Sequence, residues 1–266
     1  MTSSEQSVGD RPARPSTAFH FRSSGLTHTG LVRKHNEDAF LDSGSIGLWA
    51  VADGMGGHES GDYASQLIVD TLAATKPPES ASALLHDVKH RLDQVHLALQ
   101  SVAASRGEGS VIASTVVVLM AHGGHYACVW AGDSRAYRCR GSVLQQLTKD
   151  HSYVQSLVDQ GVLQPERAAT HPYANVVTRA VGTDQGLDLE LITGELAPHD
   201  RFLLCSDGLN RQVGDPEIAT VLASAGCDQA ATTLVDLALQ SGARDNVTAL
   251  VIDVQPATVM IDAEPV

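Results

Sequence analysis

Acidic residues recur at the ends of apolar, strand-like segments of this sequence. Each of four segments is followed or preceded by an aspartate, and these are Asp53, Asp133, Asp207 and Asp245. Asp53 and Asp207 end their segments and are followed by glycine, whereas Asp245 begins one. In an antiparallel pair the end of one strand lies beside the start of its neighbour, so Asp245 is expected next to Asp207 at one sheet edge. A single Asp-Gly is most often only a turn, but four such sites together indicate a cluster of carboxylates.

The segment 38–53 predicts a hairpin that pairs two more carboxyl groups. If Gly44 to Gly47 form a four-residue turn, Ser43 pairs with Leu48 and Asp38 pairs with Asp53. Directly opposed residues point to the same face of a sheet, and two carboxylates so close repel each other. A divalent cation removes this penalty. All the proposed ligands are oxygens, and residues 58–62 lack the second histidine of a zinc-binding helix, so Mg²⁺ or Mn²⁺ is the expected ion.

The apolar periodicity elsewhere predicts the elements that must position these carboxylates. Helices are expected at 61–74, 81–104, 216–223 and 229–240, and strands at 25–32, 39–41, 48–52, 114–121, 125–131, 136–139, 143–147, 187–193, 201–205 and 247–254. Strands in runs, with helices in pairs between them, indicate an α+β fold. The expected architecture is two packed antiparallel β-sheets flanked by pairs of α-helices, an α-β-β-α sandwich.

The expected organisation is one domain with an insertion. Residues 1–22 are interpreted as a disordered leader, 23–255 as a single domain and 256–266 as a tail. The polar segment 148–183 is helix-like only near residues 153–160 and is expected to be a mobile flap. With 43% hydrophobic residues, the chain of 266 residues has ample material for a core.

The charge balance and the apolar segments exclude two classes of partner. A net charge of -13, from 18 Lys and Arg against 31 Asp and Glu, disfavours binding to nucleic acid. The uncharged segment 111–132 is long enough to span a membrane, but His122-Gly123-Gly124-His125 divides it into two strand-length halves. It is therefore expected to form a β-hairpin, without insertion into a membrane.

The cysteines favour a reducing, cytoplasmic location. They have no close paired spacing, and most lie in or beside apolar strand-like segments, as buried free thiols do. They are Cys128, Cys139, Cys205 and Cys227.

Taken together, these motifs resemble the metal-dependent Ser/Thr protein phosphatases of the type 2C (PPM) family, in their compact bacterial form. The resemblance runs in the family's order across residues 24–254. The matching stretches are 29–30, 33–38, 51–58, 114–115, 132–135, 147–151, 177–182, 205–209 and 244–248. Each motif alone is weak, but their joint occurrence is specific.

The resemblance implies a site for two Mn²⁺ or Mg²⁺ ions, with a possible third. Asp53 would bridge both ions and the Gly54 carbonyl would bind one of them, while Asp207 and Asp245 would hold the other. Asp133, together with Asp207, corresponds to the third and weaker ion. The family pattern also places Glu37 and Asp38 near the ions, acting through bound waters.

The implied reaction is hydrolysis of phosphoserine or phosphothreonine by a water that the two cations activate, with direct attack on phosphorus. Arg33 would clamp the phosphoryl oxygens, because its guanidinium matches two of them. Eukaryotic relatives have a histidine where this chain has Met55, so either His58 or a metal-bound water would protonate the leaving group. Phosphorylated proteins and a cognate Ser/Thr kinase are the partners that the resemblance implies.

Three other interpretations stay open at this point. A catalytically dead relative would be expected to lose metal-binding aspartates, all of which this chain keeps. A different two-metal phosphoesterase, acting on nucleotides or small phosphates, could use the same carboxylates. A pure interaction module gives no reason to assemble groups that repel each other.

Overall fold

Two antiparallel sheets form the centre of the molecule. The computed structural model describes residues 19–56, 60–107 and 109–256. The first sheet has the strand order β1 (Phe19–His28), β11 (Val247–Pro256), β10 (Arg201–Cys205), β7 (Arg135–Arg140) and β8 (Val143–Gln146). The second has the order β2 (Asp38–Ser43), β3 (Leu48–Met55), β5 (Val116–His122), β6 (His125–Ala131) and β9 (Glu190–Glu195), and β4 (Ala113–Ser114) pairs with β3.

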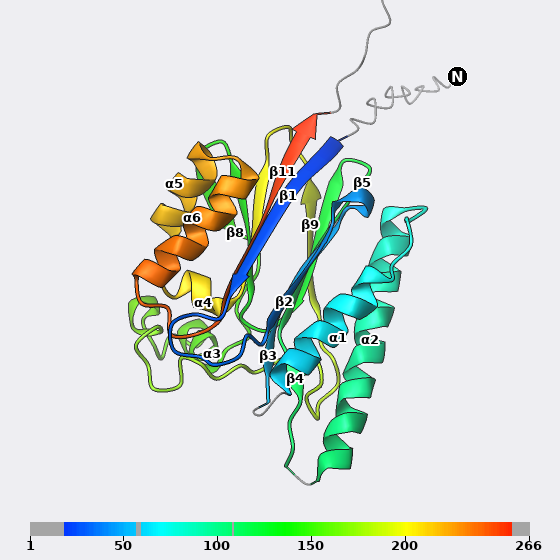
Figure 1. Ribbon diagram of the computed structural model, residues 1–266, viewed down its shortest axis with the longest axis vertical. Coiled ribbons are helices and arrows are strands. Elements are labelled where there is room, and N and C mark those ends of the chain that lie inside the picture. Colours follow the sequence, from blue (N-terminus) through cyan, green and yellow to red (C-terminus); the bar gives the residue numbers. More distant parts are fainter. Residues whose placement is uncertain (1–18, 57–59, 108, 257–266) are drawn as a thin grey trace, which may run out of the picture.

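Helices cover the outer face of each sheet. In Figure 1, α1 (Gly61–Ala73) and α2 (Ala81–Arg106) lie on one side of the strands, and α5 (Asp215–Ser224) and α6 (Cys227–Gln240) lie on the other. Two of the apolar clusters join a sheet to its helices, and a third, around Trp49 and Phe202, fills the space between the sheets. The predicted α-β-β-α sandwich is therefore confirmed.

Helix α2 shows how the sequence builds these layers. The side chains of Leu84, Val88, Leu92 and Leu99 are at most 1% exposed and follow the helical period, so one apolar stripe faces the sheet. At the start of the helix, the Ser80 hydroxyl accepts a hydrogen bond from the backbone N–H of Ala83 at 3.1 Å.

The hairpin of β2 and β3 has the predicted register. Ser43 pairs with Leu48 and Asp38 pairs with Asp53. The turn is the short 3₁₀ helix η1 (Gly44–Ile46), closed by Gly47 in the left-handed region with φ +69°. A Cβ at Gly47 would lie 2.2 Å from the carbonyl oxygen of Ala121, so only glycine fits there.

The segment 111–132 contains the predicted hairpin, since β5 and β6 pair antiparallel over residues 116–131. In the part of the chain that the structure describes, no helix has the length and apolarity that a membrane span requires. All the cysteines are buried and free of disulfides, as expected.

Several element boundaries differ from the prediction by one to three residues, and the first strand differs most. Strand β1 begins at Phe19, so residues 19–22 belong to the sheet and not to a leader, and β1 ends at His28, so the strand expected at 25–32 was misplaced. The strand is specified by its ten-residue ladder with β11, which local periodicity does not reveal. Two residues after the end of β1, Gly30 has φ +79° and packs against the backbone of Asp245. This left-handed conformation is not compatible with a continued strand. Residues 1–18 and 257–266 lie outside the described part of the chain.

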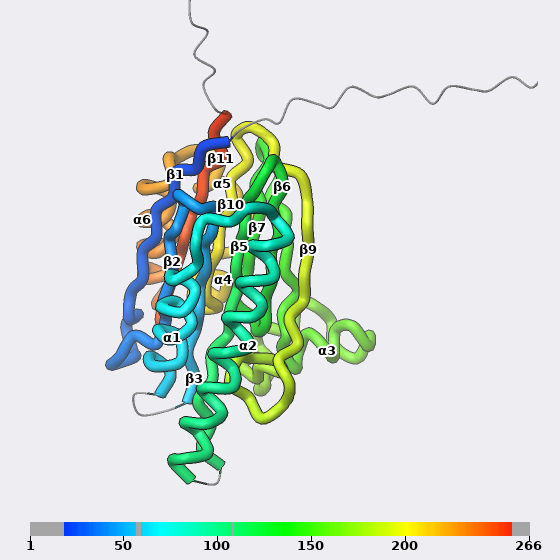
Figure 2. Tube along the Cα trace, turned by 90° about the vertical axis from the view of Figure 1, so that its right-hand side faces the viewer, coloured from blue at the N-terminus to red at the C-terminus, as the bar shows by residue number. Residues whose placement is uncertain are grey.

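The segment 148–183 forms the expected insertion between β8 and β9. It contains α3 (Tyr153–Asp159), the 3₁₀ helix η2 (Pro165–Arg167) and a series of turns. Figure 2 shows α3 projecting from the side of the sandwich, at the end where β3 stops. Helix α4 (Asp207–Asn210) is a single turn that begins two residues after the end of β10.

Candidate functional site

Asp38 is fixed from both sheets. It begins β2 in the second sheet, but its Oδ2 accepts hydrogen bonds from the hydroxyls of Ser206 at 2.6 Å and Thr248 at 2.7 Å, which follow β10 and lie in β11 of the first sheet. Its Oδ1 is buried and has no hydrogen-bond partner among the described residues. A buried carboxylate oxygen without a partner carries a large desolvation cost, so this atom is available to a ligand.

Asp53 is held in place through its backbone. Its N–H donates to the Thr115 hydroxyl at 3.2 Å, and its carbonyl oxygen accepts from the N–H of Thr115 at 2.8 Å and from the Ser114 hydroxyl at 3.0 Å. Among the described residues, its side chain forms no ion pair with an arginine, lysine or histidine. The strand end thus positions the group without neutralising it.

Gly54 permits a close backbone approach beside Asp53. A Cβ at this position would lie 1.9 Å from the carbonyl oxygen of Gly61, the first residue of α1. The N–H of Gly54 donates to the Glu37 carbonyl oxygen at 3.0 Å, and the Glu37 carboxylate accepts from the N–H of Gly61. Glu37 therefore sits at the N-terminus of α1, where the helix dipole favours a negative charge.

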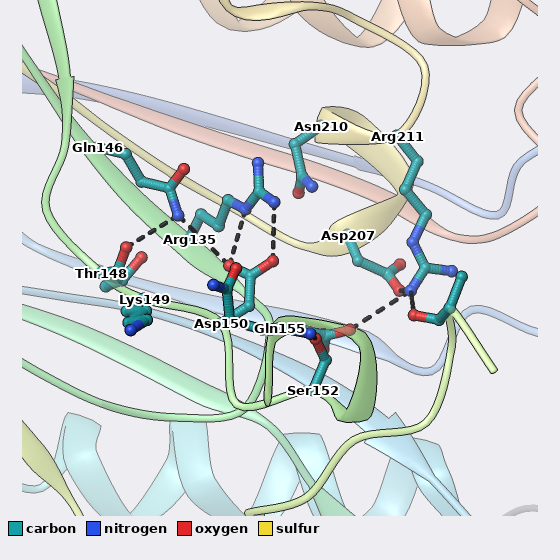
Figure 3. Close-up of polar contacts among 12 residues, drawn as sticks. Arg135, Gln146, Thr148, Lys149, Asp150, Ser152, Gln155, Asp207, Asn210 and Arg211 are labelled. Atoms are coloured by element: carbon teal, nitrogen blue, oxygen red, sulfur yellow. Dashed lines mark hydrogen bonds and ion pairs between the residues drawn. The ribbon is translucent and has the colours of Figure 1, made fainter. Parts of the chain in front are cut away.

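Asp207 follows β10 and opens α4, with Gly208 behind it. A Cβ at Gly208 would lie 1.9 Å from the carbonyl oxygen of Asn246, so this second Asp-Gly also depends on a close backbone contact. Figure 3 shows the Arg211 side chain directed at Asp207, and the ion pair measures 2.6 Å. The same guanidinium lies 3.3 Å from Oδ2 of Asp133, which comes from the loop after β6.

Asp245 and Arg33 form a two-pronged ion pair at the other side of the site. The Nε of Arg33 lies 2.8 Å from one carboxylate oxygen of Asp245, and its Nη2 donates to the other at 2.8 Å. Next to Asp245, the Asn246 side chain donates to the carbonyl oxygens of Thr29 and His35 and accepts from the N–H of Glu37. Asn246 thereby holds the loop that carries Arg33 against the start of β11.

The electrostatics show that these carboxylates converge. Burial raises the pKa of Asp53 well above its usual range, and the nearby charges of Asp38, Asp207, Asp133 and Asp245 raise it further. Burial is also the main cause that raises the pKa of Asp38 to about 7, against the lowering effect of its two hydroxyl donors. Negative charge at this place is therefore costly until a cation compensates it.

The remaining acids respond to the same crowding. The pKa of Asp133 is raised to about 7, chiefly by burial and then by the charge of Asp207, while Arg211 opposes the shift. Burial raises the pKa of Asp207 too, and Arg211 again lowers it. For Glu37, burial raises the pKa and the Arg33 charge lowers it.

The residues fit a hard divalent cation by their chemistry. The donors are carboxylate and carbonyl oxygens, and Oδ1 of Asp38 is a buried acceptor for which the described part of the chain provides no partner. Within the described residues, no three His, Cys, Asp or Glu side chains are arranged closely enough to form a finished ligand set. Two of the carboxylates are oriented by arginines, since Arg33 binds Asp245 and Arg211 binds Asp207.

The structure brings together most of the residues that the sequence singled out. The residues gathered at this end of the sandwich are Arg33, Glu37, Asp38, Asp53, Gly54, Asp133, Asp207 and Asp245. His58, the predicted general acid, lies outside the described residues. Sequence reasoning gave no separate role to Ser206, Thr248, Asn246 or Arg211, although the first three lie in the matching stretches 205–209 and 244–248. Those three act through contacts between distant segments. Arg211 lies one helical turn after Asp207, and this local spacing was the signal that could have found it.

Comparison with known proteins gives a consistent result. The family model described as Protein phosphatase 2C matches residues 31–240. The Ser/Thr protein phosphatase PstP of Mycobacterium tuberculosis is 36% identical over 233 residues, which is 88% of this chain and 45% of that protein. The Ser/Thr phosphatase stp of Listeria monocytogenes is 30% identical over 235 residues, or 85% of this chain and 93% of that one. The chain thus spans about half the length of the PstP proteins it matches.

Solved structures share the whole fold. PppA, described as a key regulatory component of T6SS in Pseudomonas aeruginosa, superimposes with a TM-score of 0.83 at 45% identity, covering 90% of this chain and 99% of that one. The catalytic domain of PstP in complex with two manganese ions gives a TM-score of 0.81 at 34% identity, over 90% of this chain and all (100%) of that one.

Proposed function

Because the chain belongs to the protein phosphatase 2C family, we propose that it is a metal-dependent phosphatase that hydrolyses phosphoserine and phosphothreonine in proteins. The observation that carries this proposal is the convergence, from both sheets, of carboxylates whose pKa values are raised by burial and by one another. Oδ1 of Asp38, which has no partner in the part of the chain that the structure describes, supports a cation as their counterpart.

We assign the metal-holding roles to residues at the two Asp-Gly strand ends and their neighbours. Asp53, with the Gly54 carbonyl, and Asp207, with Asp245, would hold the two principal ions, either Mn²⁺ or Mg²⁺. When bound, such ions lower the pKa of water toward neutrality and offset charge on a phosphoryl group. Three further acids would complete the set: Glu37 and Asp38 through water, and Asp133 at a third ion.

Arg33 is the residue we assign to the phosphoryl group. Its side chain is 50% exposed, so it can reach a substrate, and the Asp245 carboxylate already orients its guanidinium group. A guanidinium matches two phosphoryl oxygens in the same way that it matches two carboxylate oxygens. The proton for the leaving hydroxyl would come from His58 or from water at the site, the two candidates that the sequence leaves open.

The wider setting is also a proposal. We infer that a Ser/Thr kinase supplies the phosphorylated proteins, and that this chain acts in signal transduction. The buried, unpaired thiols support a cytoplasmic location. Residues 19–256 would form the catalytic domain, with 148–183 as a flap over the site.

The test is release of phosphate from a phosphothreonine peptide by metal-stripped protein, with and without added Mn²⁺. The proposal predicts release only when Mn²⁺ is present. Parallel assays with a nucleoside monophosphate and with a small aryl phosphate address the competing phosphoesterase interpretation. Equal release with and without metal, or a clear preference for the nucleotide, would contradict the proposal.

A further inference from the structure

Arg211 binds the carboxylate pair formed by Asp133 and Asp207. It follows α4 directly, one helical turn beyond Asp207, which places its guanidinium over both acids. Its Nη2 lies 2.6 Å from Oδ2 of Asp207 and 3.3 Å from Oδ2 of Asp133. The side chain of Asp207 is 13% exposed and that of Asp133 is 6% exposed, so little solvent reaches this contact and salt weakens it less than a surface ion pair.

The same guanidinium also binds the insertion 148–183. Nη1 donates to Oδ1 of Asn175, and Nη2 donates to the carbonyl oxygen of Ala174 at 3.5 Å. The next residue, Val176, accepts a hydrogen bond from the N–H of Tyr153 at the start of α3, at 2.8 Å. One side chain therefore links the carboxylates of the site to the turn that supports α3.

We propose that Arg211 competes with a divalent cation for the Asp133–Asp207 pair, and that this exchange couples occupancy of the pair to the position of the insertion. The inference rests on the proposed function, since it requires that cations bind at these carboxylates. It adds a residue that the metal-holding roles do not include.

The physical basis is that a guanidinium and a metal ion would neutralise the same charge. Oδ2 of Asp207 cannot donate its full electron density to both, so binding of one weakens binding of the other. A cation at the pair would free Arg211 from the carboxylates and leave it attached only to Asn175 and Ala174. Because such coupling is reciprocal, a change that loosens the insertion also changes cation affinity.

The first measurement is a calorimetric Mn²⁺ titration of metal-stripped wild type, Arg211→Ala and Arg211→Lys. Loss of a charge-assisted contact to Asp207 predicts that Arg211→Ala binds its weakest Mn²⁺ about tenfold more tightly. The lysine variant keeps the charge but not the fork, so an intermediate affinity is expected. The matched control is Arg167→Ala. Arg167 is an exposed arginine within the insertion 148–183, and its replacement should leave the isotherm unchanged.

The second measurement is hydrogen exchange of the backbone in residues 171–177. In the wild type, added Mn²⁺ should accelerate exchange here, because Arg211 would no longer connect this turn to Asp133 and Asp207. In Arg211→Ala exchange should already be fast and should not respond to Mn²⁺. This readout does not depend on turnover, so it separates the coupling from a loss of activity.

Three results would overturn the proposal. The first is equal Mn²⁺ affinity in wild type and Arg211→Ala. The second is an altered KM for phosphopeptide with an unchanged isotherm, which would assign Arg211 to substrate binding. The third is no Mn²⁺ binding by the wild type, which would contradict the metal site itself. Metal-dependent phosphate release together with either of the first two results would retain the phosphatase and reject the competition.

Discussion

The two Asp-Gly strand ends are alike in backbone and different in charge. After β3, Gly54 lies against the backbone of Gly61, and after β10, Gly208 lies against the backbone of Asn246, with the same hypothetical Cβ contact of 1.9 Å. Yet Asp207 has Arg211 at 2.6 Å, whereas in the described part of the chain Asp53 forms no ion pair. The close backbone contact therefore fixes where each carboxylate points, and the charge of Asp207 is balanced by Arg211, one helical turn further along the chain.

This difference concentrates the unfavourable charge at Asp53. Burial is the main cause that raises the pKa of Asp53, and the other acids of the site raise it further. Among the described residues, no arginine forms an ion pair with it. At Asp207, by contrast, Arg211 lowers the pKa against the effect of burial. We expect Asp53 to depend most on a metal ion and Asp207 to be partly satisfied by the protein itself.

Replacing each aspartate by asparagine gives the largest expected effect. Asp53→Asn and Asp207→Asn should each reduce turnover of a phosphothreonine peptide on the order of 10³-fold or more, because both would remove a ligand of the activating cations. Their effects on the metal-stripped protein should differ in sign. Asp53→Asn removes a carboxyl group that is crowded by the other acids of the site and has no ion pair among the described residues, so it should raise Tm, whereas Asp207→Asn leaves Arg211 with one carboxylate fewer and should lower it.

Thermal unfolding of metal-stripped protein checks this contrast, with Asp236→Asn as control. Asp236 is exposed on α6, so its replacement should change neither turnover nor Tm noticeably. The same Tm shift in Asp53→Asn and Asp207→Asn would show that the two sites carry equivalent charge environments, against the comparison.

The glycines provide the converse test, because here the two sites should behave alike. Gly54→Ala and Gly208→Ala would each force a methyl group against a backbone carbonyl, and each should lower the free energy of unfolding by about 2 kcal/mol or more. Gly186→Ala is the matched control, since no atom lies within 4 Å of a Cβ built there, and a change within about 0.5 kcal/mol is expected. Urea denaturation measures all three. A neutral Gly54→Ala would refute the close approach of α1.

The pH dependence of stability is the smallest expected effect. Asp38 and Asp133 have pKa values of about 7 in the folded protein against 3.8 for an ordinary aspartate, so the folded state holds protons that the unfolded chain has lost. The free energy of unfolding of metal-stripped protein should therefore rise as the pH is lowered from about 8 to about 6. His151, whose pKa is lowered by burial, acts in the opposite direction.

Differential scanning calorimetry across this range tests the sign, and Asp133→Asn should remove part of the slope. Because protons and cations compete for the same oxygens, Mn²⁺ affinity should fall over the same change of pH. A Tm that is constant or falls toward the lower pH, in both wild type and Asp133→Asn, would contradict the raised pKa values.

Local rules were sufficient for the parts of the site that are close in sequence. The register of β2 and β3 follows from a four-residue turn, and it correctly places Asp38 opposite Asp53. The pairing of Asp245 with the region of Asp207 follows from antiparallel order, and their charges do interact. The layers of the fold follow from apolar periodicity, which is strong in α2 and in the central strands.

Sequence patterns could not supply the contacts that depend on tertiary packing. Strand β1 was misplaced because its ladder with β11 joins the two ends of the described chain. The hydroxyls that hold Asp38 come from residues more than 160 positions away, Ser206 and Thr248. Arg211 reaches Asn175 only because the insertion folds back over α4, and no periodic pattern encodes that contact.

The most direct test of the central claim is the location of metal in a crystal of the wild-type protein grown with Mn²⁺. Anomalous scattering measured at the manganese edge shows the ions without any assumption about activity. The account predicts peaks within about 2.2 Å of carboxylate oxygens of Asp53, with Asp207 and Asp245 at a neighbouring peak. Peaks only elsewhere on the molecule, with none near Asp53, would contradict it.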